Sequence, residues 1–121
     1  MPYMLVVLEE SAEKDKWPDD VGRERYVRMM GFYDDLKARG VVRTAESLAS
    51  DRRGLRIKTR AGRTSVVDGP FAEAKEVVGG FFLLDCATWE EAIAIAKECP
   101  AAEWSTVEVR VVAPCWEDAV A

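Results

Sequence analysis

The chain has 121 residues, 49% of them hydrophobic, and a formal charge of -5 from 17 basic and 22 acidic side chains. This size and balance predict one soluble globular domain over residues 1–121. No apolar run approaches the roughly 20 residues that a membrane-spanning helix needs. The N-terminus also lacks a basic region before its apolar stretch, so we expect a cytoplasmic protein with no membrane partner.

Histidine is absent from the sequence. This excludes histidine-dependent catalysis and disfavours a transition-metal site, so neither a metal nor another cofactor is expected. The three cysteines, Cys86, Cys99 and Cys115, lie far apart and form no CxxC pair. They are interpreted as buried or inert thiols, not as a disulfide framework.

The first half of the chain predicts a strand, a helix and a second strand. Residues 3–9 form a nearly continuous apolar strand. A helix follows, with Pro18 suited to its start and Gly40 to its end. Residues 41–48 alternate as a strand, and residues 51–54 predict a turn. Within the helix, apolar side chains recur at helical spacing and predict a core-facing stripe, not a cofactor site. They are Tyr26, Met29, Phe32, Tyr33 and Leu36.

The second half begins with a hairpin, because residues 55–60 and 63–67 flank Ala61-Gly62. A short helical or irregular segment, 72–78, then precedes a buried strand at 79–85. Thr88 and Glu91 have capping-box spacing and open a helix over 89–99 that stops before Pro100. Its apolar face is predicted to be Ala92, Ile95, Ala96 and Cys99. Residues 105–112 predict the last strand, and residues 113–121 form a C-terminal tail without assigned structure.

This order predicts an α+β fold: a ferredoxin-like βαββαβ arrangement with an extra β-hairpin, in which two helices cover one face of an antiparallel sheet. The strand segments 3–8 and 81–84 are nevertheless apolar at both odd and even positions. Their outer face would leave a large apolar patch exposed on a monomer. We therefore expect a homodimer that packs sheet against sheet, as in a dimeric α+β barrel.

Residues 52–63 carry six basic side chains and no acidic one. Since the whole chain carries -5, these six charges leave -11 on the remainder. Arg56, Lys58 and Arg60 alternate with less polar residues and predict a strand with one wet face. This strand is either a solvated edge that discourages aggregation or a docking site for a small anionic ligand or a partner. Direct nucleic-acid binding is disfavoured, because no aromatic residues interleave with the arginines.

Asp68-Gly69-Pro70-Phe71 has the residue types of a tight turn, with Phe71 directed into the core. The charged residues Asp68, Glu73, Lys75 and Glu76 lie within nine positions. A carboxylate pair there can transfer a proton if burial raises one pKa. Asp68 is therefore the candidate catalytic residue, and all four charged residues are candidate ligand-binding residues. The alternative is a purely structural corner.

The stretch VVDGPFAEAKEVVGGFFLLD closely resembles the signature of the DGPF-domain family, a branch of the YciI-like (YCII-related) proteins. YMLVVLEE, FYDDLKARGVVRTAESL and TVEVR extend the resemblance over nearly the whole chain. It implies the dimeric barrel fold. Some family members lie beside or are fused to extracytoplasmic-function sigma factors, and YciI-like relatives have been proposed as enzymes with a His-Asp pair.

By this resemblance, Asp68 matches the motif aspartate, and Glu73, Lys75 and Glu76 match the charged positions after it. Glu108 and Arg110 match the Glu and Arg of the final-strand motif, which adds Arg110 to the ligand-binding candidates. The chain departs from the family pattern in three residues and one pair, namely Ala74 for Thr, Ser47 for Gly, Val111 for Pro, and Trp104-Ser105 where relatives often carry His or Tyr before Gly.

Because histidine is absent, a His-Asp mechanism cannot operate in this chain. Asp68 then works with a carboxylate, a lysine or a tyrosine, or the chain binds without catalysing. The expected function is a small-molecule-binding or enzymatic homodimer with a cleft near Asp68. The alternative is a regulatory module that interacts with a sigma factor or another transcription protein. A structural role without a ligand is the third possibility.

Overall fold

The computed structural model describes residues 2–116 and shows an α+β fold with two α-helices packed on an antiparallel sheet. The main elements are β1 (Tyr3–Glu9), α1 (Asp19–Ala38), β2 (Val42–Ser47), β3 (Leu55–Arg60), β4 (Arg63–Asp68), β5 (Val77–Leu84), α2 (Trp89–Glu98) and β6 (Thr106–Val111). Short 3-10 helices are η1 (Glu13–Lys16), η2 (Asp51–Arg53) and η3 (Pro100–Glu103). The last five residues of the predicted tail, 117–121, lie outside the described part of the chain.

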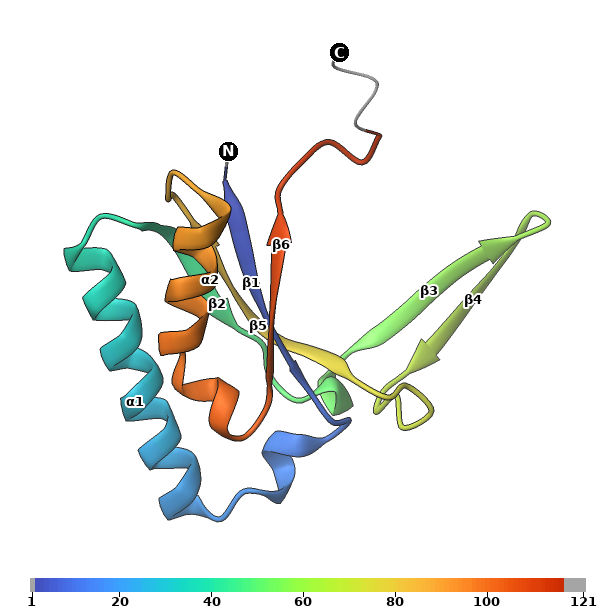
Figure 1. Cartoon of the computed structure of the whole chain (residues 1–121). Helices are drawn as coiled ribbons and strands as arrows, with labels where there is room; N and C mark the ends of the chain where they lie inside the picture. Colours follow the sequence, from blue (N-terminus) through green and yellow to red (C-terminus); the bar gives the residue numbers. More distant parts are fainter. Residues whose placement is uncertain (1, 117–121) are drawn as a thin grey trace.

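The four-stranded sheet has the order β2-β5-β1-β6, with every neighbouring pair antiparallel. This order is compatible with the predicted ferredoxin-like arrangement. Figure 1 shows α1 and α2 on the same side of the sheet. The side chains of Tyr3, Leu5 and Val7 alternate into the core, as the pleat of β1 requires. Leu36, Leu84 and Ile95 from other elements complete its fully buried centre.

Helix α1 begins after Pro18 and ends before Gly40, whose φ is +71°. Phe32 and Leu36 are buried, and Met29 and Tyr33 pack partly buried against the core. Tyr26 is 64% exposed, so its predicted place in the core is wrong. The reason is that the N-terminal half of α1 borders a cavity at this point instead of touching the sheet.

Helix α2 begins with the predicted cap. The Thr88 hydroxyl accepts a hydrogen bond from the Glu91 N–H at 3.1 Å. The Glu91 carboxylate accepts its bond from the N–H of Ala87, one residue earlier than a capping box predicts. The helix ends at Glu98, and the predicted apolar face of Ala92, Ile95, Ala96 and Cys99 is buried.

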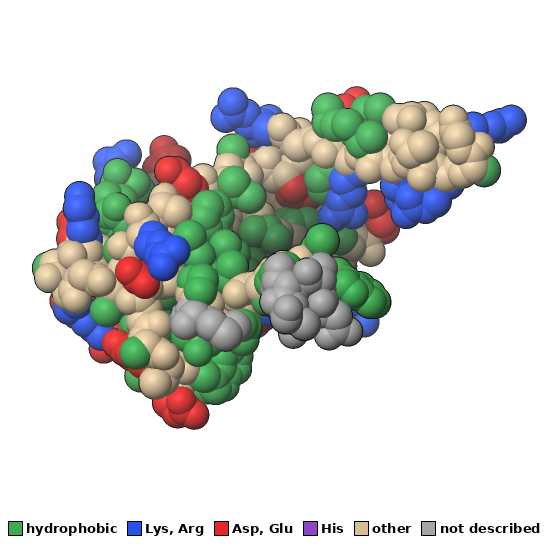
Figure 2. Space-filling view, turned by 90° about the horizontal axis from the view of Figure 1, so that it is seen from above, with side chains coloured by type: hydrophobic (Ala, Val, Ile, Leu, Met, Phe, Trp, Pro, Cys, Tyr) green, Lys and Arg blue, Asp and Glu red, His purple; other side chains and the backbone are tan. Residues whose placement is uncertain are grey.

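Strands β3 and β4 form a separate antiparallel ribbon that projects from the body of the molecule (Figure 1). Ala61 and Gly62 both have positive φ at its tip, as a two-residue hairpin turn requires. All twelve strand residues are exposed, so the predicted single wet face is wrong. The pairing puts Leu55, Ile57 and Val66 on one face, and Arg56, Lys58, Arg60 and Arg63 on the other. Figure 2 shows basic side chains along the projecting ribbon.

The face of the four-stranded sheet that points away from the helices is called the outer face below. Its centre is apolar and comes from β1 and β5, namely Met4, Val6, Leu8, Val78, Phe81 and Leu83. Its margins are polar and come from β2 and β6, namely Thr44, Glu46, Thr106, Glu108 and Arg110. Val78 is 47% exposed, and the other five central residues are half-buried. Both α-helices lie on the opposite face of the sheet, so neither of them covers the apolar centre of the outer face.

Two of the three cysteines are buried, as predicted, whereas Cys115 is exposed. Burial raises the pKa of the Cys86 and Cys99 thiols, which lowers their reactivity. Among the described residues, no helix combines the length and the apolar character that crossing a bilayer requires.

Candidate functional site

Asp51, which the sequence analysis did not select, organises the corner where the hairpin leaves the body. Its carboxylate accepts hydrogen bonds from the Ser11 hydroxyl at 2.7 Å, the Ala12 N–H at 2.6 Å and the Phe71 N–H at 2.9 Å. Desolvation raises the pKa of Asp51, but these three bonds outweigh it and lower the pKa to about 2. The carboxylate therefore stays ionised and joins three segments that are distant in sequence.

The Asp-Gly-Pro-Phe turn packs against this same corner. The Gly69 N–H donates to the Gly54 carbonyl at 2.9 Å. A Cβ on Gly69 would lie 1.8 Å from the Asp51 carbonyl oxygen, so only glycine fits there. Phe71 is buried as predicted, and the Arg56 guanidinium lies 4.1 Å from its ring centroid. Gly69 and Phe71 thus have clear structural roles in the turn.

Asp68 ends β4 on the exposed ribbon, and its carboxylate forms no hydrogen bond or ion pair with another described residue. Glu73 forms an ion pair with Arg56 at 4.0 Å. Lys75 is exposed, and Arg110 pairs with Glu108 at 3.4 Å on the outer face. Glu76 lines a small cavity of about 350 Å³ beside Glu9. The five predicted site residues therefore do not gather in one cavity, and their role in binding stays a prediction.

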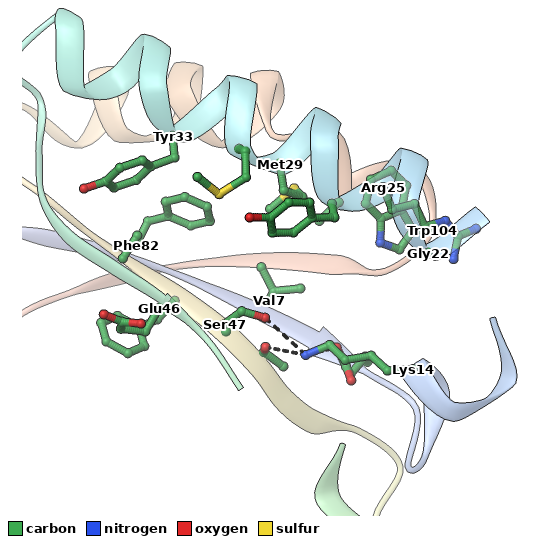
Figure 3. A pocket seen from close by; sticks show the side chains of 18 of the residues that line it. Val7, Lys14, Gly22, Arg25, Met29, Tyr33, Glu46, Ser47, Phe82 and Trp104 are labelled. Carbon is green, nitrogen blue, oxygen red and sulfur yellow. Dashed lines mark hydrogen bonds and ion pairs between the residues drawn. The ribbon is translucent and has the colours of Figure 1, made fainter. Parts of the chain in front are cut away.

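A larger cavity, of about 570 Å³, lies between α1 and the helix-facing side of β1, β5 and β2. This volume falls within the usual range of small-molecule sites. Figure 3 shows Met29 and Tyr33 reaching down from α1 toward Phe82 on the sheet. Val7 and Ala45 add further apolar wall. None of the five predicted site residues lines this cavity.

Glu9 and Lys14 form a charged pair on one wall of the cavity. The Glu9 side chain is almost fully buried, and desolvation raises the pKa of its carboxyl, although Lys14 opposes the shift. The Lys14 ammonium lies 3.5 Å from the Glu9 carboxylate and also donates to the carbonyls of Gly79, at 2.8 Å, and Leu48. A Cβ on Gly79 would lie 1.8 Å from a Glu9 oxygen. The glycine therefore makes the space that the carboxylate occupies.

The mouth of the cavity holds a guanidinium between two indole rings. Arg25 lies over the ring of Trp17 at 4.7 Å and over the ring of Trp104 at 4.8 Å. Figure 3 shows Arg25 beside Trp104 at one end of the cavity. Such cation–π contacts stabilise a cation without using its N–H donors. Within residues 2–116, no hydrogen bond or ion pair engages this guanidinium.

Two of these residues had a signal in the sequence. Glu9 continues the alternation of Tyr3, Leu5 and Val7, so period-two spacing already places it on the buried face. Arg25 precedes Met29 by four residues and therefore shares the cavity side of α1. Lys14 and Asp51 lie in irregular segments, where no periodicity indicates the direction of a side chain.

The arrangement suits ligand binding in an apolar cavity that has one carboxyl with a raised pKa. A buried carboxyl whose pKa is raised by desolvation is the type of group that can exchange a proton with a bound molecule. Among the described residues, no group of three or more Asp, Glu or Cys side chains is placed to hold a metal ion.

The structure is a small α+β domain, compatible with a ferredoxin-like fold, with a cavity of about 570 Å³ between helix and sheet. The sequence matches the model of the YCII-related domain over residues 1–116, and the chain belongs to this family. It is also 48% identical over 59 residues to an uncharacterized protein of Rhizobium meliloti (strain 1021). That match covers 47% of this chain and 48% of the relative, so the chain spans about half the length of the curated relative it matches.

Proposed function

We propose that this chain is a small-molecule-binding homodimer whose ligand occupies the cavity between α1 and the sheet. The cavity itself carries the proposal: it has about 570 Å³, mostly apolar walls and charged residues at its margins, among them Glu9, Lys14 and Arg25. A cavity with mostly apolar walls and a few convergent polar groups is the usual form of a small-molecule site. Glu9 is the residue placed to exchange a proton with a bound molecule.

A fluorescence titration with 8-anilinonaphthalene-1-sulfonate tests this proposal. Ala45→Phe places a ring in the cavity and should abolish the fluorescence increase. Val27→Phe is the matched control, because it adds the same ring at a position of α1 that is 62% exposed and does not line the cavity. It should leave the titration unchanged. Equal titration curves for the wild type and Ala45→Phe would show that the probe binds elsewhere and would reject the cavity.

The homodimer is proposed from the outer face of the sheet. Its apolar centre with a polar margin has the anatomy of a protein–protein interface. Leu83→Glu, which puts a charge in the half-buried centre, should convert a dimer into a monomer of 13.5 kDa in light scattering. Val27→Glu changes an apolar residue of α1 that is 62% exposed and should leave the dimer intact. A wild-type mass of 13.5 kDa at micromolar concentration would overturn the dimer.

A second candidate function is a regulatory module that interacts with an extracytoplasmic-function sigma factor or another transcription protein. The exposed ribbon supports it, because an isolated two-stranded hairpin is only marginally stable in water and gains stability from a partner. Charge reversal of Arg56, Lys58 and Arg60 together should abolish capture of such a partner in a pull-down. Unchanged capture would exclude this face of the ribbon.

A further inference from the structure

The two cations at the margin of the cavity differ in how their donors are used. The Lys14 ammonium has three N–H donors, and acceptors already surround it: the carbonyls of Gly79 and Leu48, the Ser47 hydroxyl at 3.5 Å and the Glu9 carboxylate. No donor of Lys14 is left for a ligand. Its charge is also offset locally by Glu9, so Lys14 is a poor anion-binding group.

Arg25 is in the opposite situation. Its guanidinium has five N–H donors, and its position over the rings of Trp17 and Trp104 uses none of them. Neighbouring Arg28 also lies over the Trp104 ring, but it pairs with the Glu103 carboxylate. Arg25 has no such acid among the described residues. It is held in place by aromatic contacts while its donors stay free.

The remaining acids near the cavity limit the charge of a ligand. Glu9 lies on the cavity wall, and Glu46 borders the cavity while its side chain lies on the outer face in Figure 3. The chain as a whole carries -5. One free guanidinium in an acidic protein suits a single negative charge, whereas a polyphosphate would need more cations.

The space behind Arg25 is mostly apolar, and several of the side chains that bound it are aromatic. Met29 and Tyr33 form its roof, and Phe82 forms part of its floor (Figure 3). We infer that the cavity binds an apolar, ring-containing organic monoanion, such as an aromatic carboxylate or sulfonate. Its charged group binds Arg25, and its rings lie between α1 and the sheet. This inference rests on the proposed function, because it names the class of ligand for the same cavity.

Two fluorescent probes that differ by one charge test the inference. 8-Anilinonaphthalene-1-sulfonate carries a sulfonate, and N-phenyl-1-naphthylamine has the same rings without it. Arg25→Gln should weaken binding of the anionic probe about tenfold, the usual effect of losing one charge-assisted hydrogen bond, and leave the neutral probe unchanged. Arg25→Lys keeps the charge without the planar donor fork and should lose less.

Arg23→Gln is the matched control, because this exposed arginine lies on the same helix and does not line the cavity. It should leave both probes unchanged, and circular dichroism should show that each variant folds. If neither probe binds the wild type in a way that Ala45→Phe abolishes, the proposed function fails. If both probes bind in the cavity and Arg25→Gln changes their affinities equally or not at all, the cavity stands and the anion inference is overturned.

Discussion

The corner around Asp51 and the β3–β4 ribbon that leaves it are adjacent in the chain but differ in what stabilises them. The corner is held by charge-assisted hydrogen bonds from Ser11, Ala12 and Phe71. The ribbon is held mainly by its own ladder, because every strand residue is exposed, and Arg56 near its base adds contacts with Phe71 and Glu73. Asp51 is therefore structurally important in the corner. Asp68 on the ribbon forms no hydrogen bond or ion pair with another described residue, although both regions are rich in charge.

The largest expected difference is between Asp51 and Asp68. Asp51→Ala removes three bonds to an ionised acceptor and should lower the free energy of unfolding by about 3 kcal/mol. Asp68→Ala removes no bond seen in the described chain and should change it by less than about 0.5 kcal/mol. Urea denaturation of the two variants measures both values. Similar losses at the two positions would contradict the contrast between corner and ribbon.

Gly69→Ala tests the close approach of the turn to the corner. The added Cβ would lie 1.8 Å from the Asp51 carbonyl oxygen, a backbone atom that cannot rotate away. We expect a loss of about 2 to 3 kcal/mol in thermal or urea unfolding. Gly31→Ala is the control, since no atom lies within 4 Å of its Cβ position in helix α1. Gly31→Ala should raise the free energy of unfolding by up to about 1 kcal/mol. If it lowers the free energy of unfolding as Gly69→Ala does, the effect at Gly69 is not specific to its contact with Asp51.

Acid should weaken the corner, because the ionised Asp51 carboxylate accepts the hydrogen bonds that hold it together. The pKa of Asp51 is lowered from 3.8 to about 2, so its stabilising contribution is fully present above pH 3.8 and is lost as the pH falls through 2. Glu9 has the opposite sign, because its raised pKa makes folding more favourable as the pH falls through the folded value. Asp51→Asn should flatten the loss of stability between pH 3.8 and 2, as measured by urea unfolding at a series of pH values. If the free energy of unfolding of Asp51→Asn falls with pH as steeply as that of the wild type, other carboxyls cause the loss of stability.

The smallest effect is expected on the ribbon. Lys58→Glu together with Arg60→Glu alters two exposed side chains and should change the free energy of unfolding by less than about 0.5 kcal/mol. Differential scanning fluorimetry of the double variant measures this. A larger loss would show that the basic face of the ribbon already contacts another part of the assembly, such as the acidic surface of a second copy.

The regular elements were predictable because their signals are local. β1, α2 and the inward face of Ala92, Ile95, Ala96 and Cys99 follow from the period of the apolar residues and from Thr88 as a cap. Tyr26 was predicted wrongly, because helical spacing does not show where the sheet diverges from the helix. The candidate site was less predictable, since the cavity joins side chains from α1, β1, β2 and β5.

The sequence by itself determined the order of elements and the family resemblance, because these depend on patterns of residues that are close in the chain. The requirement for glycine at position 69 comes from the tertiary structure, since the Asp51 carbonyl oxygen leaves no room for a Cβ there. Only the tertiary structure decided that Asp51, not Asp68, is the carboxylate that holds the turn in place. It also decided that the N–H donors of Lys14 are used by acceptors in the protein, whereas those of Arg25 have no acceptor among the described residues. The physical reason is that hydrogen-bond partners and desolvation come from segments distant in the chain, and no local pattern specifies which of them meet.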